Sequence, residues 1–175
     1  AENDKFCRHF HLSLQSGSNS VLKRMNRKYT TDEYMEIVNT IRKYMPDCAI
    51  TTDVMVGFPG ETEEEFLESL EFVRAVGFAR IHVFPFSPRK GTVAYKMKEQ
   101  IDNSVKKERV DRMIALGREL EQKFLGSMTG KVLDVLCEKD CVGYTGNYVK
   151  VVVKEEDFNE GELILVRITG VNGNE

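Results

Sequence analysis

One stretch of this chain, residues 49–65 with the sequence AITTDVMVGFPGETEEE, constrains its fold more than any other. Its β-branched and apolar residues predict a strand over residues 50–56, and two glycines and a proline predict a sharp turn over residues 57–60. Thr62 and Glu65 have the spacing of a capping box, which begins a helix. Strand, glycine turn and helix N-terminus together form the arrangement with which α/β enzymes hold ligands at the carboxyl ends of their strands.

Asp53 is an unusual residue for the middle of an otherwise apolar strand. Alternation places it on the same face as Thr51 and Met55. Its carboxylate either accepts hydrogen bonds from neighbouring backbone donors or accepts them from the hydroxyls or the amine of a ligand. The adjoining glycine turn favours the ligand.

Two further segments, residues 10–15 and 80–86, have the composition of strands. One helix is expected between the capping box at Thr30 and Pro46, and a second over residues 63–76. Because each connection is long enough for a right-handed crossover, the three strands are expected to form a parallel sheet. The first strand alternates, so one face of the sheet is expected to line an interior with the polar residues His11, Ser13 and Gln15.

Two basic segments are candidates for ligand contacts. A short helix is expected over residues 20–26. Near its end, Arg24, Arg27 and Lys28 either complement the helix dipole or neutralise a ligand carboxylate or phosphate. The loop of residues 87–92, with the sequence SPRKGT, follows the last strand of the sheet. We expect it to contact a ligand rather than to be a plain solvated turn.

The α/β part of the chain is too short for a closed (β/α) barrel, which needs eight strands. We therefore expect a fragment, the C-terminal half of a larger α/β barrel, with a long helix over residues 103–124 leading out of it. Beyond this helix the pattern changes to short strands, which predicts a small antiparallel barrel or sandwich. The predicted strands cover residues 132–137, 148–153 and 162–169. The predicted domains are residues 1–125 and residues 126–175.

Composition narrows the class of protein. An apolar content of 41% suffices for a core, no run of eighteen apolar residues predicts a membrane span, and residues 1–5 lack the pattern of a signal peptide. The four cysteines are expected to be reduced thiols of a cytoplasmic protein, with Cys137 and Cys141 at strand ends rather than in a metal site. The net charge is −3 and residues 126–175 are acidic, so RNA contacts must come from local basic patches.

Four long motifs resemble those of the radical S-adenosylmethionine methylthiotransferases; they lie at residues 9–18, 25–30, 52–62 and 82–92. The resemblance is greatest to the branch that methylthiolates N6-threonylcarbamoyladenosine in tRNA. Related branches act on N6-isopentenyladenosine and on a ribosomal-protein aspartate. Residues 142–150 resemble part of a TRAM domain, a small RNA-binding β-barrel. The implied fold class is α/β: a partial (β/α) radical-SAM barrel followed by a small all-β, TRAM-like barrel.

The resemblance implies a transferase that adds a methylthio group to C2 of the modified adenosine. S-adenosylmethionine has two roles in this family, as the methyl donor to sulfur and as the source of the radical that abstracts hydrogen. The implied partners are tRNA and a reductant protein, and the implied parent holds two 4Fe–4S clusters. This sequence lacks the family's Cys-x-x-x-Cys-x-x-Cys motif. We therefore expect no cluster in this fragment, and no activity from it alone.

The resemblance also implies roles for individual side chains. The residues expected to contact the methionyl and ribose parts of S-adenosylmethionine are His11, Ser13, Gln15, Thr51 and Asp53, and those at the adenine are Phe84 and Ser87. Substrate phosphate is expected at Arg89 and Lys90, and at the tail residues Lys131, Lys150, Lys154 and Arg167. Tyr144 and Tyr148 either stack on RNA bases or belong to the core of the small barrel. We expect no catalytic side chain and no metal ligand in this chain.

Two other functions are compatible with parts of the sequence. The chain could be a non-catalytic RNA-binding module with an α/β scaffold, or a conventional α/β enzyme complete in itself. The second alternative is disfavoured because no nucleophile–base grouping and no phosphate-loop motif occurs. An open half-barrel also exposes strand edges, so we expect an edge to be covered or to pair with another chain, for example in a dimer.

Overall fold

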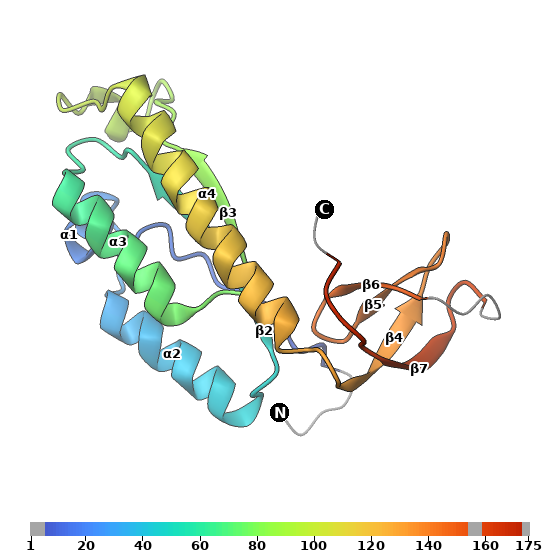
Figure 1. Ribbon diagram of the computed structural model, residues 1–175. Coiled ribbons are helices and arrows are strands. Elements are labelled where there is room, and N and C mark those ends of the chain that lie inside the picture. The colour runs from blue at the N-terminus through green and yellow to red at the C-terminus, as the bar shows by residue number, and fades with distance from the viewer. Residues whose placement is uncertain (1–5, 154–158, 173–175) are drawn as a thin grey trace.

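The computed structural model describes residues 6–153 and 159–172, and it contains two separate sheets (Figure 1). A parallel sheet lies in the first part of the chain, and an antiparallel sheet lies in the last part. No helix in the described residues is both long and apolar enough to cross a membrane. The mixed α/β class with two different sheets is therefore as predicted.

The parallel sheet has the strand order β1-β2-β3. Its strands are β1 (His9–His11), β2 (Ala49–Val56) and β3 (Arg80–Pro85). In the register of the sheet, His11 lies opposite Thr51, and Asp53 lies opposite His82. The three-stranded parallel sheet expected from the sequence is thus confirmed.

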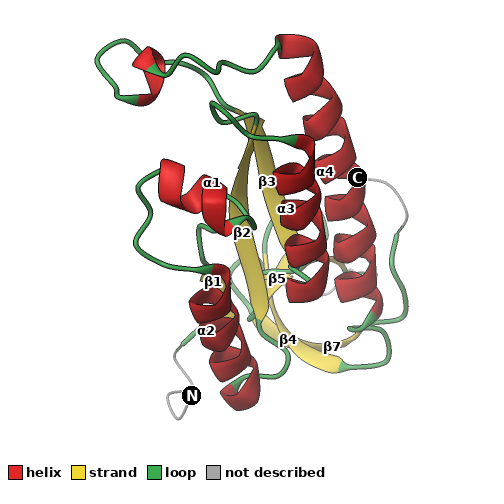
Figure 2. Cartoon of the chain, turned by 90° about the vertical axis from the view of Figure 1, so that its left-hand side faces the viewer, coloured by secondary structure: helices red, strands yellow, loops and turns green. Residues whose placement is uncertain are grey.

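Three long helices lie side by side on one face of this sheet (Figures 1 and 2). They are α2 (Thr31–Tyr44), α3 (Glu63–Val76) and α4 (Asn103–Gly126), and the shorter elements are α1 (Asn19–Arg24) and a 3-10 turn, η1 (Ala94–Lys96). Both expected capping boxes are present, with Thr30 and Thr62 each accepting from the backbone N–H three residues on. Gly77 ends α3 with a φ of 65°, a left-handed conformation that glycine adopts without strain.

The core lies between these helices and the sheet. Its fully buried side chains include Leu14, Val38, Val54, Phe66, Val73, Phe78 and Met113. Burying each such side chain contributes roughly 1.5–3 kcal/mol, and this burial holds the helices on one face only. The other face of the sheet is polar, and it carries His9, His11, Asp53 and His82.

The first strand is shorter than the sequence predicts. The alternating pattern of residues 10–15 indicates one strand, but β1 ends at His11. Gln15 has a left-handed backbone with a φ of 67°, which turns the chain. Its backbone still pairs with β2, because its N–H donates to the Asp53 carbonyl and its carbonyl accepts from Met55. The prediction of a continuous strand over residues 10–15 is therefore wrong.

The antiparallel sheet has the strand order β6-β5-β4-β7. Its strands are β4 (Val132–Cys137), β5 (Val142–Thr145), β6 (Lys150–Val152) and β7 (Leu163–Arg167). The predicted strand at residues 132–137 is confirmed, whereas β5 was not predicted and β6 and β7 are shorter than expected. Within the described residues β6 and β7 are unpaired edges, so closure into a TRAM-like barrel remains a prediction.

The two sheets meet at the loop before β2. The Lys131 ammonium lies 2.5 Å from the Asp47 carboxylate, and the Asn147 side-chain amide donates to the Asp47 carbonyl at 3.0 Å. The backbone N–H of Arg8 donates to the Gly146 carbonyl. The division at residues 125 and 126 remains a prediction, and α4 runs through it to Gly126.

Candidate functional site

The polar face of the parallel sheet carries a connected cluster of side chains from β1 and β2. The Thr51 hydroxyl lies 3.2 Å from Nε2 of His9 and 3.0 Å from Nδ1 of His11. Strand alternation points these side chains to one face, and the parallel register sets them beside one another. Thr51 therefore fixes two imidazole rings at once.

Asp53 extends this cluster toward the carboxyl ends of the strands. Its Oδ2 lies 3.2 Å from Nε2 of His11 and accepts a hydrogen bond of 3.2 Å from the Ser13 hydroxyl. No backbone N–H in the described residues donates to this carboxylate. The alternative that neighbouring backbone donors satisfy it is therefore wrong. The side chain is 30% exposed. Its other oxygen is available to accept a hydrogen bond from a ligand hydroxyl or ammonium group.

The structure brings together most, but not all, of the residues expected at the cofactor. Phe84 pairs with Met55 in the sheet, so alternation places it on the face of Asp53 and His82. Gln15 does not join the cluster, because its left-handed backbone turns the chain and its side chain is only 7% exposed. Ser87 lies beyond the end of β3 and lines a different pocket.

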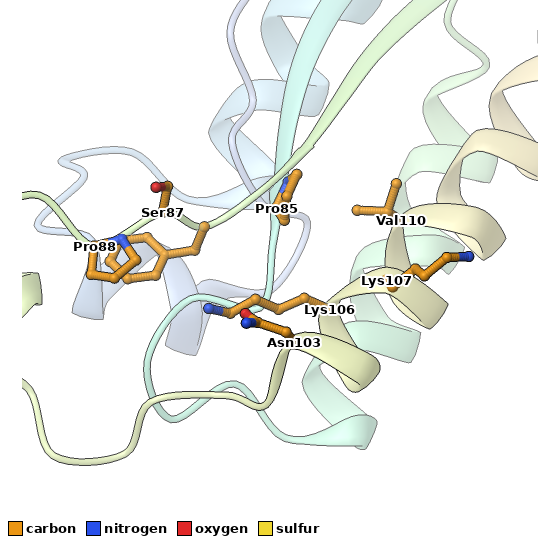
Figure 3. Close-up of a pocket in the computed structure, with 8 residues that line it drawn as sticks. Pro85, Ser87, Pro88, Asn103, Lys106, Lys107 and Val110 are labelled. Atoms are coloured by element: carbon orange, nitrogen blue, oxygen red, sulfur yellow. The ribbon is translucent and has the colours of Figure 1, made fainter.

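That pocket, with a volume of about 420 Å³, lies between the loop after β3 and the first turns of α4 (Figure 3). It is lined by Pro85, Phe86, Ser87, Pro88, Asn103, Lys106, Lys107 and Val110. Arg89 and Lys90, which directly follow Pro88 in the chain, are exposed. Arg24 is committed to the bidentate ion pair with Glu65, which leaves Arg27 and Lys28 as the exposed members of the other basic segment.

Three aromatic rings form a ladder between the two sheets. Tyr148 stacks on Tyr144 and on His9, with 5.2 Å between ring centroids in both pairs. Tyr148 is 65% exposed and Tyr144 is half-buried, so neither tyrosine belongs to the core of the small sheet. Burial lowers the pKa of His9, and the neighbouring charge of His11 lowers it further. Sequence reasoning missed His9, although the alternation that identified His11 also places it on this face.

Comparison with known proteins shows what the chain is similar to. Residues 1–73 match the radical SAM superfamily. The chain is 44% identical, over 95% of its length, to the threonylcarbamoyladenosine tRNA methylthiotransferase MtaB of Bacillus subtilis. It is 50% identical, over 77% of its length, to the tRNA-2-methylthio-N(6)-dimethylallyladenosine synthase of a Thermoanaerobacter species. The chain is a relative of the radical SAM tRNA methylthiotransferases.

The chain spans only part of the length of these methylthiotransferases. It covers 39% of the Bacillus subtilis protein and 29% of the Thermoanaerobacter protein. A third relative, the MtaB protein of Thermotoga maritima, is 40% identical over 97% of this chain, which covers 40% of that protein. The activity, substrates and partners of the whole protein are therefore matters for proposal.

Of the two cofactor types implied by the family, S-adenosylmethionine and iron–sulfur clusters, the residues on the polar face of the parallel sheet fit the first. The free oxygen of Asp53, beside the Ser13 hydroxyl and the His11 ring, suits the hydroxyl and ammonium donors of S-adenosylmethionine. Iron–sulfur clusters do not fit the described residues, which hold no group of three or more His, Cys, Asp or Glu side chains placed to bind a metal. Cys7 and Cys141 are exposed, while Cys48 and Cys137 are buried.

The basic residues expected to meet substrate phosphate differ in their surroundings. Lys131 is paired with Asp47, and Arg167 donates to the Gly130 carbonyl at 3.1 Å. Lys150 is exposed and lies beside Tyr144 in the sheet register. Lys154 lies outside the described residues. Lys150 is therefore the strongest candidate among the three of these cations that the structure describes.

Proposed function

We propose that this chain is part of an enzyme that adds a methylthio group to C2 of N6-threonylcarbamoyladenosine in tRNA. The observation that carries the proposal is the 44% identity over 95% of the chain to a relative named for this nucleoside. The second candidate substrate is N6-dimethylallyladenosine, because relatives named for that nucleoside are up to 50% identical over 77% of the chain. A tRNA substrate also implies a cytoplasmic enzyme.

S-adenosylmethionine, when bound, supplies the methyl group and the radical chemistry. The described residues bind S-adenosylmethionine and orient it. Asp53 accepts hydrogen bonds from the ribose hydroxyls or the ammonium group, while Ser13 and His11 hold its carboxylate in one orientation. Phe84 offers an apolar surface on the same face for the adenine. The clusters belong to other parts of the parent enzyme, and a separate reductant protein supplies their electrons.

The substrate test uses a strain that lacks the full-length gene. Mass spectrometry of its tRNA nucleosides is expected to show threonylcarbamoyladenosine without its methylthio group, restored by the wild-type gene. If only the methylthio group of dimethylallyladenosine disappears, the second candidate is correct. If both methylthio nucleosides persist, the proposed function is wrong.

The cofactor test replaces Asp53 by Asn in the full-length enzyme. We expect the affinity for S-adenosylmethionine to fall by about tenfold or more, because a charge-assisted hydrogen bond contributes roughly 1.5–3 kcal/mol. Iron content should not change. The matched control is Asp134→Asn, which replaces an exposed carboxylate on β4 and should leave the affinity for S-adenosylmethionine unaltered. Equal affinities for both variants would remove Asp53 from the cofactor site.

A further inference from the structure

Lys106, in the first turn of α4, has a buried stem and no ion-pair partner in the described residues. The residue is only 6% exposed, and its ammonium nitrogen makes no hydrogen bond with the described residues. The nearest stabilising group is the ring of Phe86, whose centroid lies 5.6 Å away. The stem is buried while the ammonium nitrogen keeps contact with solvent at the pocket, so its charge is open to an anion there.

The backbone of the turn after β2 holds Lys106 in this position. A Cβ at Gly57 would lie 2.4 Å from Cγ of Lys106, so only glycine lets the lysine stem lie across the turn. Gly57 also has a φ of 71°, which a larger residue adopts only with strain. The stem is therefore packed in one path, and the ammonium group is directed toward the pocket (Figure 3).

No carboxylate in the described residues forms an ion pair with Lys106, although its charge, after the hydrogen bonds from Ser104, helps to lower the pKa of Asp102. Asp102, four residues before Lys106, accepts hydrogen bonds from the Ser104 backbone at 2.8 Å and from its hydroxyl at 2.5 Å. It therefore caps α4 and forms no ion pair with Lys106. The adjacent Lys107 is different, because its ammonium lies 2.7 Å from the Asp111 carboxylate and its side chain is 77% exposed.

We propose that this pocket binds an oxyanion, and that the oxyanion is a backbone phosphate of the RNA substrate. Lys106 supplies the charge, and the Asn103 amide and the Ser87 hydroxyl on the pocket wall supply hydrogen-bond donors. The exposed Arg89 and Lys90 on the adjoining loop attract the strand toward it. The choice of RNA rests on the proposed function, whereas the oxyanion site rests on the geometry alone.

The test measures tRNA binding by the full-length enzyme as a function of salt concentration, using fluorescence anisotropy. Lys106→Gln is expected to lower the slope of log affinity against log salt by roughly 0.7–0.9, the value for one lost phosphate contact. Lys43→Gln, which removes an exposed lysine on α2 outside the pocket, is the control, and its slope should equal that of wild type. Lys106→Arg keeps the charge and is expected to retain the wild-type slope.

Two further measurements keep the outcome decisive. Ser87→Ala leaves the buried lysine untouched, so weaker tRNA binding by this variant supports the site even where Lys106→Gln folds poorly. Inorganic phosphate should raise the melting temperature of wild type more than that of Lys106→Gln, even if the enzyme binds no tRNA and the proposed function fails. An unchanged slope together with unchanged tRNA affinity for Ser87→Ala would overturn the proposal. So would a loss of S-adenosylmethionine affinity in Lys106→Gln at an unchanged slope, because the pocket would then take the cofactor carboxylate.

Discussion

Tyr148 owes its position to an unusual backbone conformation. Its φ of 64° lies in the left-handed region, which costs a residue with a side chain on the order of 1 kcal/mol or more. The conformation places its ring between Tyr144 and His9, on two different sheets. A single strained residue thus connects the small sheet to the polar cluster of the large one.

The first prediction concerns the effect of this ring on His9. Burial is the main cause of the lowered pKa of His9, so Tyr148→Ala should raise that pKa toward the ordinary value of about 6.5. The histidine ring protons can be followed by NMR as a function of pH. Tyr95→Ala, an exposed tyrosine in η1, is the control and should not move the pKa.

The same shift fixes how His9 contributes to stability across pH. A lowered pKa means that folding favours the neutral ring, so the contribution is complete above pH 6.5 and is lost as the pH falls through the folded-state pKa. Tyr148→Ala should reduce this loss, measured as the difference in unfolding free energy between pH 7.5 and pH 5. A larger loss in the variant would contradict the stacking role.

At the scale of elements, a buried ion pair fastens α4 to the turn after β2. Nη1 of Arg109 donates to the Glu61 carboxylate at 2.8 Å and to its backbone carbonyl at 3.0 Å, and both side chains are buried. The Glu61 carboxylate also accepts from the Gly57 backbone N–H. Burial raises the pKa of Glu61 and outweighs the opposing effect of the Gly57 N–H and of Arg109. This attachment keeps the first turns of α4, and so Lys106, against the sheet.

The second prediction is that Arg109→Met destabilises the protein by roughly 3–5 kcal/mol, because it leaves the Glu61 carboxylate buried without its charge partner. Arg112→Met is the control on the same helix. Arg112 pairs with Glu63 at the surface, so its loss should cost about 0–1 kcal/mol. Urea unfolding measures both values, and equal costs would show that burial of the first pair is unimportant.

Most elements could be predicted because their ends carry local signals. The helix α3 has its predicted limits, since Thr62 begins it and Gly77 ends it. The strands were less predictable where the backbone becomes left-handed at Gln15 and Tyr148, residue types that rarely adopt this conformation. The alternation of polar and apolar residues continues through these left-handed positions, so it does not indicate where the strand ends.

The candidate site likewise has a part that the sequence predicts and a part that it does not. Asp53, His11 and Ser13 could be predicted to share a face, because strand alternation and a parallel sheet suffice. The site at Lys106 could not, since it depends on how α4 packs against the turn at Gly57. One sequence signal does indicate that Lys106 lies on the buried face of α4. It is at helical spacing with the other buried residues of this helix, which are Arg109, Met113, Leu116 and Leu120.

For the whole molecule, one buried amide lies at the centre of the contacts between the two sheets. Asn147 is only 6% exposed, and its side-chain nitrogen reaches both the Asp47 carbonyl and the Met128 sulfur. The Thr145 hydroxyl donates to its side-chain oxygen at 2.5 Å. Lys131 reinforces the contact through its ion pair with the Asp47 carboxylate.

The third prediction is that Asn147→Ala loosens the small sheet, because it leaves the Asp47 carbonyl without its donor at a cost of roughly 1–3 kcal/mol. Amide hydrogen exchange should become faster in β5 and β6 and remain unchanged in β2. Asn159→Ala, at an exposed position beside β7, is the control and should alter neither. Uniform acceleration in both sheets would mean that they unfold as one unit.

The length of α4 has a consequence for the size of the substrate. Its 24 residues span about 36 Å, since each residue adds about 1.5 Å. The pocket with Lys106 lies at its first turn, and the antiparallel sheet begins just beyond its last (Figure 1). The RNA that we propose as substrate must bridge a comparable distance to contact both ends at once, so α4 sets the shortest RNA that can do so.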